Sequence, residues 1–143
     1  MTQTKRRGMT LADAGREFWR HPSPWLLVAA FVGAVAARLV VGDWQWSDAV
    51  LPFVVLAVFP FAEWLIHVFI LHWRPRRIAG VMIDSELARK HREHHADPRI
   101  TRLIFIPLQS LAGAFAAALV VAFVLIPRTG LGLTFLVTLF AIG

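Results

Sequence analysis

The 143-residue sequence contains no cysteine and no tyrosine, and only 17% of its residues are charged. The absence of cysteine excludes disulfide bonds, thiolate metal ligands and thiol nucleophiles. Hydrophobic residues make up 57% of the chain, against about 45–50% in an average soluble domain. A chain of about 150 residues buries only about 70% of its unfolded surface on folding, so a soluble core could not hide this excess. The composition therefore excludes an ordinary soluble domain and predicts an integral membrane protein.

Basic residues outnumber acidic ones by 15 to 9, and their positions are uneven. Five lie before residue 21, and eight lie between Arg74 and Arg102. Basic segments that flank apolar spans follow the positive-inside pattern and bind anionic headgroups. This distribution argues against nucleic acid as a partner. It predicts that the N-terminus and segment 74–102 are cytoplasmic, at the cytoplasmic membrane if the chain is prokaryotic.

Residues 1–24 are expected to form a cytoplasmic or interfacial segment. Thr10 and Asp13 have the spacing of an N-terminal cap pair, which favours a short helix from Thr10 to His21 that lies in the interface; a plain polar leader is the alternative. Ser23 as cap and Pro24 in the first turn then indicate the start of a longer helix.

Apolar runs divide residues 25–143, which are interpreted as one membrane domain. The runs are 25–41, 49–73, 103–127 and 131–143. The last is shorter than the about 17–25 residues that a spanning helix needs. We therefore expect an all-α protein with three transmembrane crossings, a partial fourth and a cytoplasmic histidine-bearing helical segment at 74–102. Arg38 is expected to snorkel at the end of its span, and Pro52 and Pro60 are expected to kink theirs.

Three histidines lie within the basic segment. Asp84 or Ser85 is a candidate cap for a helix over about 85–95, which Pro98 would end. On that helix His91 and His95 are four residues apart and share a face, and His94 lies three after His91. The His94–His95 doublet directs its rings apart, an arrangement suited to two neighbouring metal ions.

Two more histidines, His67 and His72, end the second apolar run. On an α-helix a separation of five residues places them about 140° apart, so they could approach different ions. Glu63 lies one turn earlier within apolar sequence, where an ionisable group is costly; its simplest role is to accept a hydrogen bond from the second ring nitrogen of His67. The alternatives are a packing role for each histidine and a solvated or headgroup-bound basic segment. His21 stands apart and is interpreted as an interfacial residue.

The candidate ligands form one pattern, which is Glu63, His67-x4-His72 and then His91-x2-His94-His95 followed by Asp97-Pro98. This pattern resembles that of the fatty acid hydroxylase and sterol desaturase superfamily of membrane di-iron enzymes. The resemblance implies that His67, His72, His91, His94 and His95 bind two metal ions, with iron expected and zinc possible. It also implies O₂ as co-substrate, and ferredoxin or a b-type cytochrome as electron donor. The implied reaction is hydroxylation of a C–H bond in a lipid acyl chain, as part of lipid biosynthesis.

One departure from that family is that no histidine follows His95. Members carry further histidine groups after a returning transmembrane hairpin. The expectation is that this chain is the N-terminal part of a longer enzyme and inactive alone, or that a homodimer assembles one site from two chains. The alternative functions are a carotenoid or sterol oxidase of the same superfamily and a non-catalytic metal-binding or structural membrane protein.

Overall fold

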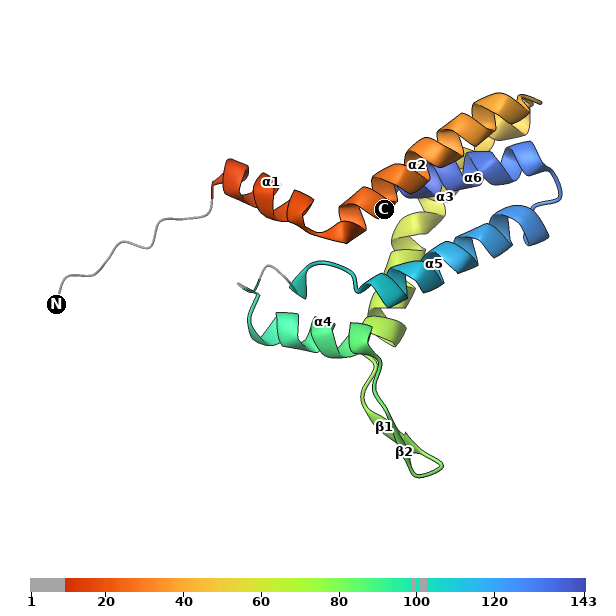
Figure 1. Cartoon of the computed structure of the whole chain (residues 1–143). Coiled ribbons are helices and arrows are strands. Elements are labelled where there is room, and N and C mark those ends of the chain that lie inside the picture. Colours follow the sequence, from red (N-terminus) through yellow and green to blue (C-terminus); the bar gives the residue numbers. More distant parts are fainter. Residues whose placement is uncertain (1–9, 99, 101–102) are drawn as a thin grey trace.

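A computed structural model describes residues 10–98, 100 and 103–143, so residues 1–9 of the predicted N-terminal segment and three loop residues lie outside it. Of these described residues 76% are helical, which agrees with the all-α prediction. Within the same ranges three helices are long and apolar enough to cross a membrane, at Pro22–Val41, Trp46–Leu71 and Leu108–Leu125. Figure 1 shows them gathered with the shorter C-terminal helix α6 (Thr129–Ile142), while α1 (Leu11–Arg20) extends to one side.

The predicted cap of α1 is confirmed. The Asp13 amide donates to the Thr10 hydroxyl over 3.2 Å, and the Thr10 amide donates to the Asp13 carboxylate over 3.1 Å. The predicted cap of α2 (Pro22–Val41) is wrong, because the helix starts earlier. Pro22 occupies the first position, where its fixed φ already suits a helix and its missing N–H costs no bond, and Ser23 lies inside the first turn.

The second apolar run forms α3 (Trp46–Ile66), which continues into the π-helical turn η1 (His67–Leu71). The helix begins three residues before the predicted 49–73 span because Gln45 and Asp48 form a capping box. The Gln45 amide donates to the Asp48 carboxylate over 2.8 Å. Pro52 and Pro60 both lie inside α3.

A β-hairpin follows, and the sequence interpretation did not include it. Strands β1 (Arg76–Ile78) and β2 (Val81–Ile83) are antiparallel, with Arg76 opposite Ile83 and Ile78 opposite Val81. The turn residues Ala79 and Gly80 have φ of 50° and 82°, and positive φ at both central residues is what a two-residue I′ turn requires. The sequence signal for this hairpin is the presence of apolar residues on both sides of the pair Ala79–Gly80. Helix α4 (Glu86–Ala96) then begins as predicted, with the Ser85 hydroxyl accepting from the Ala88 amide over 3.2 Å.

The third apolar run forms α5 (Leu108–Val120) and the π-helical turn η3 (Val121–Leu125). It starts five residues later than the predicted 103–127 span, because Pro107 takes the cap position with a ψ of 139°, which lies outside the helical range. The most buried helix is α6, which packs against α2, α3 and η3. A side chain at Gly132 would overlap the carbonyl oxygen of Ala122, so glycine is needed for this close approach.

A buried ionic cluster joins α2, α3 and α6 at the Gly42 end of the helices. Arg38 and Asp48 are only 3% and 6% exposed, and the Arg38 Nη2 lies 3.2 Å from Asp48 Oδ2. Thr134 accepts a hydrogen bond from Arg38 Nε over 2.9 Å and donates to Asp48 Oδ1 over 3.0 Å, and Arg128 Nη2 donates to Asp48 over 2.7 Å. The prediction that Arg38 snorkels is therefore wrong: a carboxylate on the neighbouring helix provides a partner that an isolated span lacks.

Candidate metal centre

His67 and His72 lie side by side because the chain between them forms a π-helical turn. The His72 amide donates to the His67 carbonyl oxygen over 3.1 Å, a bond across five residues. Such a turn brings residues five apart toward one face, and π-turns of this kind are frequent at functional sites. The two Nε2 atoms are 3.1 Å apart. On an α-helix the two rings would point about 140° apart. Here they lie side by side instead, because the hydrogen bonding changes from α-helical to π-helical at His67.

The second histidine pair is placed by ordinary α-helical geometry. His91 and His95 are four residues apart on α4 and share a face, as predicted. Their ring centroids are 4.6 Å apart, and their Nε2 atoms are 3.0 Å apart.

The two pairs meet because α4 packs against η1. The ring of His67 is centred 4.7 Å from that of His91, and the ring of His72 is centred 5.1 Å from that of His95. One ligand nitrogen from each of the four lies within 4.8 Å of the others. We call these four residues the histidine cluster: His67, His72, His91 and His95.

His94 lies beside the histidine cluster but outside it. Its ring is centred 6.4 Å from that of His95. Its Nδ1 atom is buried and has no hydrogen-bond partner within the described part of the chain. Its role as a ligand stays a prediction.

Glu63 is exposed on α3, four residues before His67. Among the residues that the structure describes, no hydrogen bond joins its carboxylate to His67. The proposed support of the His67 ring by Glu63 therefore also stays a prediction.

Arg92 closes the loop that separates the two histidine pairs, and sequence reasoning did not identify it. Its Nη1 donates to the carbonyl oxygen of Trp73 over 2.6 Å. Its Nη2 donates to both oxygens of Asp84, each over 2.8 Å. Trp73 follows His72 directly and Asp84 precedes α4, so one guanidinium fixes both ends of the hairpin against α4. Arg92 is one of eight basic residues from Arg74 to Arg102, so the sequence alone carries no signal that distinguishes it.

Burial, and after it the positive charges that His95, His67, His72 and His94 would carry, together lower the pKa of His91 to about 4. At neutral pH His91 is consequently a neutral imidazole. Only the neutral ring has a free lone pair for a metal.

Within each histidine pair the donor spacing fits a transition metal ion, and across the pairs one nitrogen of each residue lies within 4.8 Å of the others. Metal–nitrogen bonds of about 2.0–2.1 Å give tetrahedral nitrogen–nitrogen edges of about 3.3–3.4 Å. The two Nε2 pairs, at 3.1 and 3.0 Å, are close to this spacing. Imidazole suits zinc, iron and copper alike, so the donor set does not select one metal.

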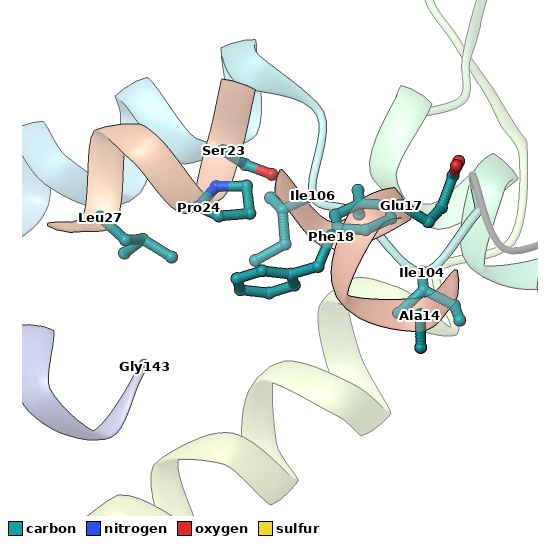
Figure 2. A pocket seen from close by; sticks show the side chains of 10 residues that line it. Ala14, Glu17, Phe18, Ser23, Pro24, Leu27, Ile104, Ile106 and Gly143 are labelled. Carbon is teal, nitrogen blue, oxygen red and sulfur yellow. The ribbon is translucent and has the colours of Figure 1, made fainter. Parts of the chain in front are cut away.

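Two pockets share the segment Ile104–Phe105–Ile106 as a wall. The larger, of about 390 Å³, lies between α1, the start of α2 and this segment, and its lining is mostly apolar. Figure 2 shows the Glu17 carboxylate directed away from Phe18 and Leu27 in this pocket. The smaller, of about 110 Å³, is lined by Leu71, Leu87 and His91 as well as the shared wall.

No protein-family model, curated protein or solved structure matches this chain. The candidate metal centre therefore rests on its own geometry.

Proposed function

We propose that this chain is an integral membrane metalloprotein whose histidine cluster is the redox centre of a lipid-oxidising enzyme of the fatty acid hydroxylase type. The observation that carries the proposal is the convergence of four imidazoles from two separate elements. Two come from a π-turn and two from α4, and the connecting hairpin is fixed at its base by Arg92.

Membrane insertion is supported by the three long apolar helices. In the proposed orientation the histidine cluster is cytoplasmic, because the basic residues of segment 74–102 lie at that end. The ionic cluster around Arg38 and Asp48 then lies at the opposite face of the membrane.

In the proposed enzyme the histidine cluster holds iron, and His94 contributes to a second ion. Bound iron would supply activation of O₂: one oxygen atom enters a substrate C–H bond, and the other leaves as water after uptake of two electrons and two protons. A ferredoxin or a b-type cytochrome is the proposed source of the electrons. The chain itself positions the donors, through the π-turn for His67 and His72 and through Arg92 for α4.

A lipid acyl chain is the proposed substrate. The apolar pocket of about 390 Å³ beside α1 can hold part of such a chain. It shares Ile104–Phe105–Ile106 with the smaller pocket that reaches His91, so a rearrangement of this segment would join the two. A carotenoid or a sterol is the alternative substrate within the same reaction class.

The four-nitrogen geometry also favours a second candidate, a non-catalytic zinc site. Structural zinc sites use four protein ligands and leave no open position, whereas catalytic sites keep one. In that case the metal would stabilise the contact between η1 and α4. In the enzyme proposal, by contrast, a second copy of the chain would supply further ligands, and a homodimer would then hold the second ion beside His94.

The full chain, purified in detergent and loaded with Fe(II) under anaerobic conditions, tests the proposal. Addition of reductant, isotopically heavy O₂ and membrane lipid should give a lipid product that carries the heavy isotope. His95→Ala should abolish the product, and Arg89→Ala, an exposed position on α4 outside the cluster, should leave it unchanged. Tight zinc binding with no oxygen incorporation under any loading would contradict the enzyme proposal and favour the structural site.

A further inference from the structure

The β1–β2 hairpin presents apolar side chains to its surroundings. All six strand residues are exposed. The register places Ile78, Val81 and Ile83 on one face, together with Arg76 at the base of that face. Their exposed fractions are 51%, 65% and 43%. Figure 1 shows the hairpin standing away from the helices.

Such a hairpin needs a surrounding other than water. An isolated two-stranded hairpin is marginally stable at best in water, because it has no third element against which to bury a face. Arg92 fixes the base of the hairpin through its bonds to Trp73 and Asp84, but these bonds do not reach the strand residues. An exposed, alternating apolar edge of this kind is also a liability for aggregation unless something covers it.

The charge of the hairpin indicates what covers it. Arg74, Arg76 and Arg77 lie within four positions, and residues 74–83 contain no acidic residue. The Arg76 guanidinium lies 5.1 Å from the centre of the Trp73 ring, and Trp and Arg together are typical of the headgroup level of a bilayer. The hairpin also follows the apolar helix Trp46–Leu71 with only a short connection, so it starts where that helix would leave the acyl region.

We propose that the β1–β2 hairpin is a second membrane contact that binds an anionic lipid surface. Ile78, Val81 and Ile83 enter the upper acyl region, and the three arginines bind lipid phosphates. The contact holds the loop between the two histidine pairs, so the bilayer helps to position α4 against η1. The proposal requires membrane insertion of the chain but not its oxidase activity.

Single-cysteine labelling tests this contact, because the native chain has no cysteine to interfere. Ile78→Cys and Val81→Cys of the full chain would each carry an environment-sensitive fluorophore. The proteins would be placed in nanodiscs of phosphatidylcholine alone or of phosphatidylcholine with phosphatidylglycerol. Val54→Cys, at an exposed position within the Trp46–Leu71 helix, gives the fluorescence and quenching of a label in lipid. Free fluorophore in buffer gives those of a label in water.

In anionic nanodiscs both hairpin labels should be quenched by lipids with a nitroxide on the upper acyl chain and protected from aqueous acrylamide, an uncharged quencher that the surface potential does not repel. Protection from acrylamide should be at least threefold greater than in neutral nanodiscs, and replacement of Arg74, Arg76 and Arg77 by Gln should remove that difference. Acrylamide quenching of both labels at the level of free fluorophore would overturn the proposal. Contact between the fluorophores of two protein copies, increasing with the number of copies per nanodisc, would also overturn the proposal. In that case a second copy of the chain would cover the hairpin.

Discussion

The Nε2 atoms of His67 and His72 lie 3.1 Å apart although five residues separate them in sequence. The π-turn between them makes this possible, and α4 brings His91 and His95 to the same point. Two different helical geometries therefore produce matching pairs of donors. The proposed metal centre depends on both pairs and on the loop that joins them.

Arg92 should support metal binding without contacting the metal. Arg92→Ala removes the bonds to Trp73 and Asp84, so α4 can move relative to η1 while all four histidines remain. We expect metal affinity to fall on the order of tenfold, the lower end for residues that support ligands. Competition with a chromophoric chelator measures this. Arg89→Ala, an exposed position on the same helix, is the matched control and should leave affinity unchanged.

Stability of the metal-free protein should fall as pH decreases from about 6.5 to about 4. The pKa of His91 is about 4 in the folded protein and near 6.5 in an unfolded chain, so within this window the unfolded chain binds more protons. Protonation then favours unfolding, and the loss levels off below pH 4. Thermal unfolding in detergent with chelator present measures it. A His91→Gln variant should lose part of this pH dependence, and an undiminished dependence would contradict the assignment to His91.

Arg38 should be essential to the buried ionic cluster that joins α2, α3 and α6. Arg38→Met leaves Asp48 without one of its buried cationic partners, and removing one partner of a buried pair typically costs about 3–5 kcal/mol. Arg16→Met breaks the exposed pair with Asp13, which solvent screens, and should leave the free energy of unfolding nearly unchanged. Denaturant unfolding in micelles compares them. Equal effects of the two substitutions would show that the buried cluster does not join the helices.

Gly132 should tolerate no side chain. Gly132→Ala places a methyl group against the Ala122 carbonyl oxygen, so α6 and η3 must separate. Gly113→Ala meets no atom within 4 Å and should be neutral or stabilising by up to about 1 kcal/mol, because alanine is the better helix former. Unfolding midpoints of the two variants in the same detergent give the comparison. Similar midpoints would contradict the close helix contact.

The sequence was sufficient to predict features that depend on local pattern. Apolar runs identified the long helices, Thr10 and Asp13 identified the cap of α1, and the spacing of His91 and His95 identified one face of α4. Each of these depends on neighbouring residues alone.

Features that depend on contacts between distant residues could not be predicted in this way. The sequence predicts a snorkelling Arg38, because its partner Asp48 lies on the next helix and the pairing is invisible in the local pattern. It predicts diverging rings for His67 and His72, because nothing in the local pattern indicates the π-turn against which α4 packs. The role of Arg92 depends on Trp73 and Asp84, which only the folded hairpin brings together.

Metal content of the purified full chain tests the central claim most directly. The wild-type chain, loaded with Fe(II) or Zn(II) and freed of excess, should retain at least one metal ion per chain by mass spectrometry of the elements. His67→Ala, His72→Ala, His91→Ala and His95→Ala should each lose that ion, and His21→Ala should retain it. Equal retention by the wild type and all four cluster variants would contradict a metal centre built from these histidines.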